Sequence, residues 1–560
     1  MANSYPNFNT LIEYFYHWEN TTPDKIFLRQ PKGDTWKTLT FAGAGQEARK
    51  MATALAAMGL QKGDHIAIFS KNCYHWILAD LAIMMGGFVS VPLYASLPKK
   101  QLQEVLKKSD SKALFVGKLD VWGNRADAIS KDVQVIRFPH YEGNAKVEIG
   151  TDWAALLNQH EAQTENFIPD PNSLWTILFT SGTTGSPKGV MHLHRTPAEI
   201  STNEMKTNWL GVYKYQNHRF LSFLPLNHVG ERIGIETTAL CSGGMISFAE
   251  SLDTFAKNLQ DTQPTLFFAV PRIWTKFYLG VAAKIPPQKL NFLLKIPIVS
   301  TFIKRKLLKS LGMSNAKIVA TGAAITPAYI KDWYKKLGIH LIEAYGMTEV
   351  CGSMTNSPMR DYPADSVGKS IPRGEVKIHP ETGEILMKSP YMMVGYYKEP
   401  EMTATVLIDG WMHSGDKGKM DENGFLKVIG RVKDAFKTSK GSYVTPNPLE
   451  EVLGKNDYIE QVCVVGLGIP QPIAVVNLSE IGLAADKSVV ATSLQQTLQE
   501  LNQTVANYER VSTMVIDPNP WNETNGLLTP TLKVRRGAID DAYGRNYLEW
   551  HEGKEKVVWM

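Results

Sequence analysis

Cysteine is scarce in this sequence. The 560 residues contain only four cysteines, and these stand far apart in the chain: Cys73, Cys241, Cys351 and Cys463. No two of them have the spacing of a metal-binding pair, and they do not form the regular pattern of a disulfide-stapled protein. We therefore expect free thiols and a reducing compartment.

Long hydrophobic runs are also missing. The longest apolar stretch, 77–93, is interrupted by Asp80, Ser90 and two consecutive glycines, so it is too short and too broken to cross a bilayer. It predicts a buried helix that runs into a strand. The first residues lack the basic and apolar regions of a secretory signal. We expect a cytoplasmic protein, with peripheral contact at the inner face of the membrane left open.

The sequence has no strong excess of one charge. It carries 60 basic and 55 acidic residues, a formal net charge of +5, which is small for this length. No stripe of basic residues alternates with aromatic residues, so nucleic-acid binding is not expected. The partners should instead be small molecules, and the protein a monomer or a homodimer.

The length of 560 residues predicts two or three domains. Apolar residues at helical spacing over 42–59 are followed by a turn and a short strand at 65–69, and the same order recurs over 102–116 and 256–270. This alternation favours an α/β protein with largely parallel sheets. Beyond about residue 370 turns become frequent, which predicts antiparallel β structure and then an α+β unit from about residue 432.

The segment 180–189, TSGTTGSPKG, follows an apolar strand-like stretch. Its ten residues include three glycines, five hydroxyl side chains and Lys188. Glycines let backbone N–H groups turn toward an anion, and the hydroxyls and the lysine add donors and charge, so the composition predicts a phosphate-binding loop. It is not a Walker A loop, because Pro187 precedes the lysine. A flexible surface loop is the alternative for a glycine-rich segment seen alone.

Three other segments carry weaker signals when taken singly. In 343–349 an aromatic ring and Glu349 could serve a base and Mg²⁺, although a Tyr-Gly turn before a surface glutamate is common. In 409–416 and 430–434 an aspartate and an arginine could hold a ribose, although a turn and a surface ion pair are the better explanation when each segment is seen alone. In 528–536 one lysine lies in a Pro/Thr-rich loop, which alone predicts only a solvated basic loop.

Together, in this order and at these separations, the four segments resemble the adenylate-forming superfamily of acyl-CoA synthetases, firefly luciferase and peptide-synthetase adenylation domains. The resemblance extends over about 11–536. The segments 224–232 (LPLNHVGER), 270–274 (VPRIW) and 529–533 (TPTLK) are similar to the long-chain fatty acyl-CoA synthetase branch.

The resemblance implies an α/β fold in two domains. A large N-terminal domain, 1–432, would hold two α/β subdomains with parallel-type sheets and a β-rich subdomain. A small, mobile α+β domain, 433–560, would rotate about Lys433. The rotation would remove Lys533 from the site and bring in a loop that contacts coenzyme A, with the residues Lys437, Lys440 and Gly441.

The resemblance also implies roles for individual residues. The ATP phosphates would be held by Thr180, Ser181, Gly182, Thr183, Thr184, Gly185 and Lys188, and Mg²⁺ by Thr180 and Glu349. Adenine and the α-phosphate would lie against Gly322, Ala323, Ala324, Glu343, Ala344, Tyr345, Gly346, Met347 and Thr348, and the ribose against Asp416 and Arg431. The catalytic set would be Lys533, which bridges the acyl carboxylate and the α-phosphate, with His228 beside the acyl pocket, Thr184 and Glu349.

The chemistry implied is ATP-dependent joining of a carboxylic acid to coenzyme A through an acyl-AMP. The acid is already ionised at neutral pH, because its pKa is roughly 4–5. No general base is needed, and the task is to neutralise charge between carboxylate and triphosphate. The sequence departs from the superfamily pattern at Leu532 and Lys440, where glycine is common.

The substrate is expected to be a medium- to long-chain fatty acid, although the sequence does not reveal the chain length. The alternatives are a fatty acyl-AMP ligase that serves a carrier protein, an aryl-acid–CoA ligase, and a non-catalytic nucleotide- or lipid-binding protein. The segment 284–309 has seven basic and no acidic residues among apolar ones. It could lie on an anionic membrane or pack on the core with a solvated basic face.

Overall fold

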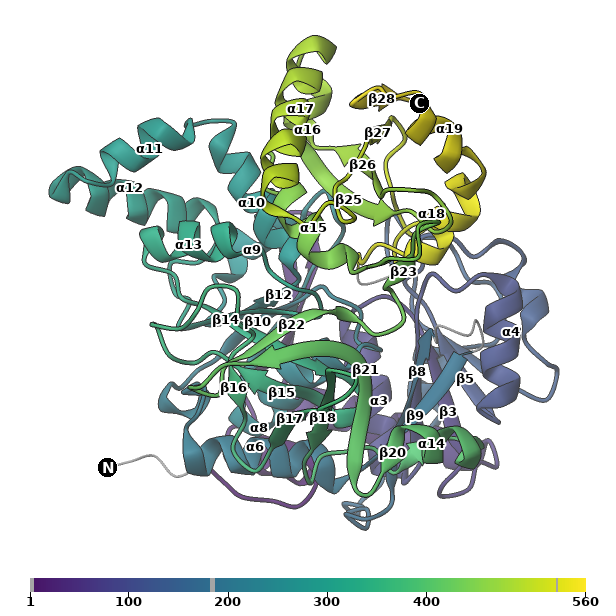
Figure 1. Ribbon diagram of the computed structural model, residues 1–560. Coiled ribbons are helices and arrows are strands. Elements are labelled where there is room, and N and C mark those ends of the chain that lie inside the picture. The colour runs from purple at the N-terminus through teal and green to yellow at the C-terminus, as the bar shows by residue number, and fades with distance from the viewer. Residues whose placement is uncertain (1–4, 182–186, 530–531) are drawn as a thin grey trace.

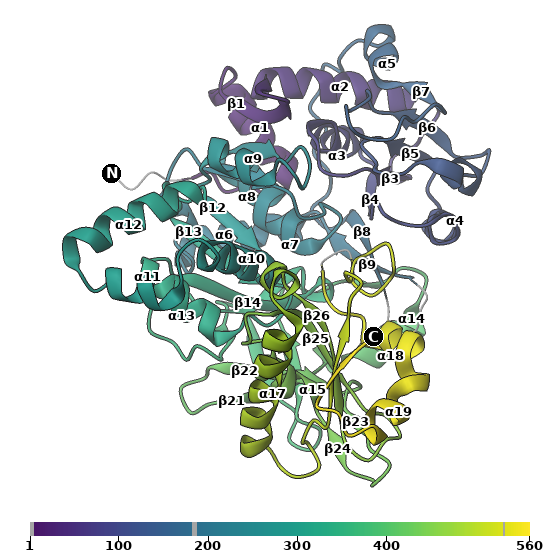
Figure 2. The same cartoon turned by 90° about the horizontal axis from the view of Figure 1, so that it is seen from above.

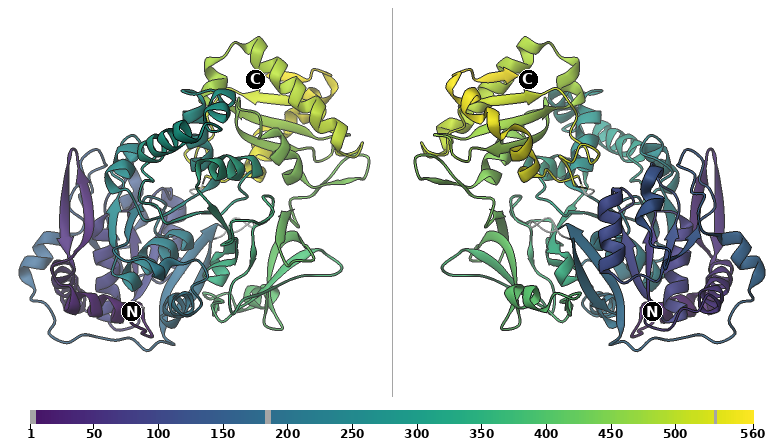
Figure 3. Two further views of the ribbon diagram at one scale, coloured as in Figure 1. Left: turned by 90° about the vertical axis from the view of Figure 1, so that its left-hand side faces the viewer. Right: turned by 90° about the vertical axis from the view of Figure 1, so that its right-hand side faces the viewer.

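Two parts of unequal size make up the structure, a computed structural model that describes residues 5–181, 187–529 and 532–560 (Figure 1). The large N-terminal part contains three mixed sheets and one antiparallel sheet. The C-terminal part, yellow-green in Figure 3, stands over the larger one. This arrangement confirms the predicted α/β fold class with a large and a small part.

An eight-stranded sheet forms the first layer of the large part, in the order β19-β9-β8-β4-β3-β5-β6-β7. All neighbours run parallel except β9, which is antiparallel to both β8 and β19. The strands are β3 (His65–Phe69), β4 (Val89–Leu93), β5 (Ala113–Val116), β6 (Gln134–Arg137), β7 (Thr151–Asp152), β8 (Leu174–Ser181), β9 (Pro187–Leu193) and β19 (Gly395–Tyr396).

Both faces of this sheet are covered, as the alternation of side chains along a strand requires. Ile66 and Ile68 of β3 pack into one cluster with helices α1 (Leu11–Thr21), α2 (Phe41–Ala57) and α3 (Tyr74–Gly86). Ala67 and Phe69 pack on the opposite face, against α4 (Lys99–Lys108). The remaining helices of this layer are η1 (Gly123–Ala128) and α5 (Trp153–Gln159).

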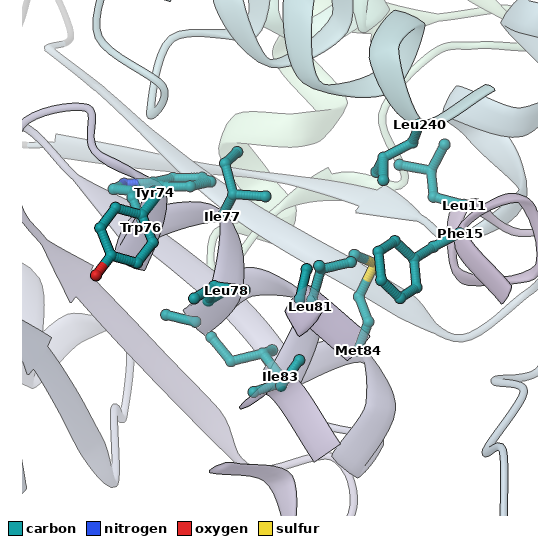
Figure 4. Packing of buried hydrophobic residues seen from close by; sticks show 14 of the residues in the cluster. Leu11, Phe15, Tyr74, Trp76, Ile77, Leu78, Leu81, Ile83, Met84 and Leu240 are labelled. Atoms are coloured by element: carbon teal, nitrogen blue, oxygen red, sulfur yellow. The ribbon is translucent and has the colours of Figure 1, made fainter. Parts of the chain in front are cut away.

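Helix α3 lies in the middle of the core. All its residues from Tyr74 to Met85 are buried, and Figure 4 shows several of them against α1 and Leu240. A helix that is apolar all round is stable only when it is surrounded by protein. The prediction of a buried helix leading into a strand over 77–93 is therefore confirmed by α3 and β4.

Two further sheets complete the α/β layers. One has the order β10-β11-β1-β2 and the other β12-β13-β14-β15-β16; β12, β13 and β14 are parallel. The strands are β1 (Ile26–Lys32), β2 (Thr35–Thr40), β10 (Arg219–Ser222), β11 (Met245–Phe248), β12 (Leu266–Ala269), β13 (Ile318–Gly322), β14 (Leu341–Met347), β15 (Gly352–Asn356) and β16 (Lys369–Ser370).

Helices and short turns surround these two sheets. They are α6 (Arg195–Thr207), η2 (Val212–Lys214), α7 (Val229–Glu231), the π-helical turn η3 (Arg232–Thr237), α8 (Thr238–Ser242), α9 (Phe255–Thr262), α10 (Pro271–Ala282), α11 (Pro287–Leu293), α12 (Pro297–Ser310), α13 (Ala328–Leu337) and η4 (Thr348–Val350).

The β-rich region and the C-terminal part follow. The first contains β17 (Glu375–Ile378), β18 (Glu384–Lys388), α14 (Pro400–Val406), β20 (Leu407–Ile408), β21 (Trp411–Met420) and β22 (Leu426–Arg431). The second contains β23 (Phe436–Lys437), β24 (Tyr443–Val444), α15 (Pro446–Leu453), β25 (Ile459–Val465), β26 (Ile473–Leu478), α16 (Glu480–Ala484), α17 (Lys487–Thr504), β27 (Met514–Asp517), α18 (Arg536–Tyr543), η5 (Gly544–Asn546), α19 (Tyr547–Glu552) and β28 (Val557–Trp559).

The domain boundary predicted at 432/433 falls in the turn between β22 and β23. Within the ranges that the structure describes, no helix combines the length and apolar character needed to cross a membrane.

Candidate active site

A cavity of about 1980 Å³ lies where the two parts of the molecule meet. Its wall draws residues from the ends of β13 and β14, from the β21–β22 hairpin, from α7 and η3, and from the loop before α18. In open α/β sheets the carboxyl ends of parallel strands are the usual place for a ligand. The four segments singled out in the sequence all contribute to this cavity.

Close backbone packing shapes the wall formed by β13 and β14. A Cβ on Gly322 would stand 2.7 Å from the carbonyl oxygen of Ala344, and one on Gly346 would overlap the carbonyl oxygen of Gly352. Ala323 has a φ of 67°, in the left-handed region that non-glycine residues rarely adopt. This wall presents backbone and a ring face rather than bulky side chains, which suits a flat ligand.

Tyr345, Asp416 and Arg431 form a connected group on the cavity wall. The Tyr345 hydroxyl donates to Asp416 Oδ2 at 2.8 Å, and Arg431 Nε lies 3.0 Å from Asp416 Oδ1. Strand pairing sets the last two residues opposite each other in β21 and β22. The carboxylate is thus held in place, and it keeps lone pairs that can accept hydroxyl groups of a ligand.

Glu349 lies nearby in η4 and is 7% exposed. Its Oε1 accepts a hydrogen bond of 2.7 Å from the Tyr396 hydroxyl, and the Lys188 ammonium lies 5.3 Å from the centre of the Tyr396 ring. Glu349 and Thr180 of β8 both line the cavity. Hard oxygen donors of this kind fit Mg²⁺, which usually takes one or two carboxylates and completes its shell with phosphate and water.

No group of three or more His, Cys, Asp or Glu side chains gathers around a metal-sized space among the described residues. A Mg²⁺ ion that arrives with a nucleotide needs no such group, because the phosphates supply most of its ligands.

Glu343 lines the cavity, but its carboxylate serves the protein itself. Oε1 accepts hydrogen bonds from the backbone and hydroxyl of Thr326 at 3.2 and 3.1 Å, and Oε2 lies 3.3 Å from Lys331 Nζ. Burial raises the pKa of Glu343, while Lys331 and Thr326 lower it. The geometry indicates support of the β14 wall rather than direct contact through this side chain.

His228 stands at the start of α7, in the LPLNHVGER segment. Its Nδ1 accepts a 3.1 Å hydrogen bond from the backbone N–H of Gly230, so the neutral ring carries its proton on Nε2. Burial, and then the charge of Lys533, lower the pKa of His228 to about 4. At neutral pH His228 is therefore an uncharged hydrogen-bond donor on the cavity wall.

The residues after His228 explain how it is held. Arg232 Nη2 lies 2.9 Å from both carboxylate oxygens of Asp80 on α3, and both side chains are fully buried. The Arg232 guanidinium also lies 4.4 Å from the Trp175 ring centre. Asn72 binds the carbonyl of Leu224 with its amide at 2.6 Å. The conspicuous Arg232 of the motif thus anchors the segment to the core and does not face the cavity.

Lys533 reaches the same cavity from the C-terminal part. Lys533 keeps accessible surface toward the cavity, but many protein atoms surround its side chain. This burial lowers the pKa of Lys533, the charge of Arg431 lowers it further, and Asp416 raises it. The loop is closed by hydrogen bonds from Thr529 N to the Lys533 carbonyl and from Leu532 N to the Thr529 carbonyl, both 2.8 Å.

Leu532 has a φ of 62°, which explains why glycine suits this position elsewhere in the superfamily. A left-handed conformation costs a non-glycine residue roughly 1–2 kcal/mol. Here the Leu532 side chain packs against a hydrophobic cluster of the C-terminal part, which offsets part of that cost.

A few polar contacts hold the two parts together around the cavity. Arg272 Nη2 of the VPRIW segment lies 2.7 Å from Glu460 Oε1. The Tyr278 hydroxyl donates to Asp457 at 3.2 Å, and Tyr329 donates to the Gly454 carbonyl at 3.2 Å. Additional contacts join Lys276 to Glu460 and Ser96 to Glu523.

Some predicted site residues do not come together here. Lys437, Lys440 and Gly441 lie in or beside the β23–β24 hairpin and are not among the described residues that line the cavity. Lys433 does line it. Ser181 ends β8, and Gly182, Thr183, Thr184 and Gly185 lie outside the described residues.

A set of apolar residues from the α/β layers also lines the cavity, and we call this set the apolar branch. Gly234 of η3 lies on the cavity wall, and a Cβ built there would meet no atom within 4 Å. The polar residues Ser201, Glu204 and Tyr213 also line the cavity. The apolar lining residues include Ile200, Leu210, Val212, Ile233, Leu266, Phe268, Ile318, Ala320 and Ile342.

Several residues that line the cavity were not predicted from the sequence. Tyr94, Asn227, Gly234 and Tyr396 all line the cavity. Asn227 lies inside the 224–232 segment, directly before His228, and Gly234 lies two residues beyond that segment, so extending the segment could have found Gly234. Tyr94 and Tyr396 follow no local pattern, because only the fold brings them to the site.

Family models match most of the chain. The model described as AMP-binding enzyme matches residues 15–397, and the AMP-binding enzyme C-terminal domain matches residues 433–547. The long-chain-fatty-acid–CoA ligase FadD15 of Mycobacterium bovis is 27% identical, with 96% of each chain covered. The long-chain-fatty-acid–CoA ligase 5 of Rattus norvegicus is 28% identical over 90% of this chain and 82% of its own.

Solved structures share the fold. The adenylation domain of a carboxylate reductase from Mycobacterium chelonae gives a TM-score of 0.80 at 22% identity, covering 97% of this chain and 91% of that one. A benzoate–CoA ligase from Burkholderia xenovorans gives 0.74 at 18% identity, covering 95% and 100%. With its four motifs gathered around one cavity and both family models matched, the chain belongs to the AMP-binding enzyme family, the adenylate-forming superfamily that its sequence resembles.

Proposed function

We propose that this protein is an ATP-dependent fatty acid–CoA ligase acting on medium- to long-chain acids. The first step would join the carboxylate to the α-phosphorus of ATP and release pyrophosphate; the second would transfer the acyl group to the thiol of coenzyme A and release AMP. One observation carries the proposal. A single cavity is lined by the Tyr345–Asp416–Arg431 group, by Lys533 and by the residues of the apolar branch.

The nucleotide would occupy the wall made by β13, β14 and the β21–β22 hairpin. The Tyr345 ring and the close-packed backbone at Gly322 offer a flat surface for adenine, and Asp416 offers acceptors for the ribose hydroxyls. Lys188 and the loop before it would take the phosphates. Mg²⁺, when bound, would neutralise phosphate charge, and Glu349 and Thr180 are the residues that would hold it.

Charge neutralisation is the main catalytic demand, because a carboxylate must approach a triphosphate. Lys533 supplies a positive charge in a cavity whose protein walls displace part of the bulk water, which strengthens its interactions. His228 supplies a neutral N–H donor that would orient the carboxylate without adding a proton to it. No general base is required, since the attacking oxygen is already ionised at neutral pH.

The second step requires the C-terminal part to move. Lys440 and Gly441 lie away from the cavity in this arrangement, while Lys533 lies in it. Rotation about Lys433 would exchange them and place the β23–β24 hairpin near the thiol. The small number of polar contacts between the parts is compatible with such a movement.

The apolar branch supports a fatty acid as the substrate, and the curated relatives are named for long-chain fatty acids. Among proteins of the same fold are also ligases named for aromatic acids. An aromatic acid is therefore the second candidate, favoured only by this structural likeness.

Pyrophosphate release from a series of acids tests the proposal. We expect the highest kcat/KM among acids from octanoate to stearate, with acetate and cinnamate much lower. Release of AMP with free coenzyme A, in the absence of any carrier protein, tests the acceptor. Pyrophosphate release without thioester formation would favour a fatty acyl-AMP ligase, and no pyrophosphate from any acid would leave only nucleotide or lipid binding.

A further inference from the structure

The helical hairpin α11–α12 projects from the large part of the molecule. Figures 1 and 2 show both helices at the periphery, away from the sheets. The hairpin follows directly on α10, whose last turns border the active-site cavity through Lys276, Leu279 and Gly280. It contains the basic segment 284–309.

One side of the hairpin packs on the protein. Leu290 and Leu307 are buried, and Leu294, Ile303 and Leu308 pack against the same cluster with part of their surface exposed. These contacts fix the hairpin as a folded element. One side of the segment 284–309 thus packs on the core, as the alternative to membrane contact predicted.

The opposite side exposes large apolar residues. Phe292 is 64% exposed, Ile298 86% and Phe302 69%, and Ile296 in the turn is also exposed. Ile298, Phe302, Arg305 and Lys309 follow one another at intervals of four, three and four residues, so they share one face of α12. An apolar group concentrated in this way on a projecting element is unusual for a surface that only meets water.

The same surface is strongly basic. Seven Lys and Arg residues and no acidic residue occur in 284–309. None of the seven forms an ion pair within the ranges that the structure describes. The basic residues are Lys284, Lys289, Lys295, Lys304, Arg305, Lys306 and Lys309.

We propose that the α11–α12 hairpin docks on the surface of an anionic lipid bilayer. Phe292, Ile298 and Phe302 would enter the boundary between headgroups and acyl chains, and the basic residues would meet anionic headgroups. A second copy of this chain fits less well, because a two-fold contact would set the same positive charges against each other. If the proposed function holds, docking would bring the α10 border of the cavity near fatty acid dissolved in the bilayer.

Co-sedimentation with vesicles tests the docking. The full-length protein is mixed with vesicles of phosphatidylcholine alone, or of phosphatidylcholine with phosphatidylserine, at low and high salt. We expect binding to the anionic vesicles that weakens with salt, and little binding to the neutral ones.

Paired variants separate the two components. Ile298→Ser with Phe302→Ser removes apolar contacts, and Arg305→Gln with Lys309→Gln removes two charges. Each pair should weaken binding roughly tenfold or more. Two basic residues near an anionic surface, or two apolar side chains inserted below the headgroups, contribute at least that much to the affinity. The matched controls are Leu252→Ser with Leu483→Ser and Lys100→Gln with Lys107→Gln, which alter exposed residues elsewhere and should bind like the unaltered protein.

The result can be read independently of catalysis, since sedimentation needs no turnover. Circular dichroism and thermal melting confirm that each variant is folded. The proposal is overturned if the unaltered protein ignores anionic vesicles, if neutral vesicles bind equally well, or if the hairpin variants bind as the controls do. A concentration-dependent increase in mass that the hairpin variants abolish, without vesicle binding, would identify a second copy as the occupant instead.

Discussion

The two parts of the molecule contribute to the cavity in different ways. The large part presents its groups on sheet strands whose backbones touch, so that Gly322 and Gly346 leave no room for a Cβ. The C-terminal part presents Lys533 on a short loop, and the described contacts around the cavity are mainly polar ones such as Arg272 with Glu460 and Tyr278 with Asp457. The wall is therefore tightly packed, whereas the lysine sits on the part that must move if the proposed function holds.

We infer that the two parts of the molecule have different roles. Recognition of a flat ligand and a ribose needs fixed geometry, which neighbouring strands supply. A charge needed in only one of two steps is better placed on a separable part. Substitutions in each part can test whether these roles are separate.

Lys533→Ala should abolish most adenylation while ATP still binds. Loss of one well-placed charge donor typically costs about 10²–10³ in rate, and the nucleotide wall is untouched. Pyrophosphate release measures the rate, and calorimetry measures ATP binding. Lys440→Ala, whose lysine lies outside the cavity, is the control and should release pyrophosphate normally. Near-normal pyrophosphate release by Lys533→Ala would contradict the role assigned to Lys533 in adenylation.

Lys433→Pro should separate the two steps. Proline fixes φ at this turn and restricts the preceding residue. The substitution should therefore hinder rotation of the C-terminal part more than it disturbs the arrangement in which Lys533 lines the cavity. We expect thioester formation to fall roughly tenfold or more, equivalent to about 1.4 kcal/mol of barrier, with pyrophosphate release largely kept. Single-turnover assays of each step provide the measurement. An equal fall in both would contradict a hinge at this residue.

Gly234→Phe should shorten the acids that the protein accepts. A Cβ at this position meets no atom within 4 Å, so a larger side chain can fill the apolar branch instead of displacing the core. We expect kcat/KM for stearate to fall about tenfold or more relative to octanoate. Gly234→Ala is the matched control with a small effect. Unchanged chain-length preference in Gly234→Phe would place the acyl chain elsewhere.

The pH dependence of adenylation should reflect the lowered pKa of Lys533. The charged form is the active one, and charge is lost as the pH rises through the pKa. The alkaline limb should therefore lie below the ordinary lysine value of about 10.4. Lys533→Arg stays charged, so any residual activity should lose this limb. His228, with a pKa of about 4, should add no change near neutrality. An identical limb in both proteins would assign it to another group.

Glu460→Gln should have the smallest effect. It removes a partly exposed ion pair to Arg272, and such pairs contribute about 0.2–1 kcal/mol. Adenylation should change by less than about fivefold, since 1 kcal/mol corresponds to roughly that factor. A larger loss would mean that this contact, rather than the Lys533 loop itself, controls how the C-terminal part is placed.

Much of the fold could be read from local patterns. The helix and strand over 77–93 and the strand at 65–69 follow from apolar periodicity and turn residues, which act over a few neighbours. The wall proposed for the nucleotide could also be predicted, because Tyr345, Asp416 and Arg431 stand in recognisable segments. The sequence predicted Glu343 as a ligand-binding residue. It gave no sign that Lys331 would pair with its carboxylate and Thr326 donate a hydrogen bond to it.

The alternation of helices and strands and the order of the four motifs depend on residue type and spacing along the chain, as does the scarcity of cysteine. Other features appear only in the packed structure. The Tyr396 hydroxyl donates to Glu349, Arg232 is buried against Asp80, and Phe292 and Phe302 are exposed on a hairpin with seven basic residues. Those outcomes depend on which distant segments pack together, because burial and pairing are properties of the assembled core.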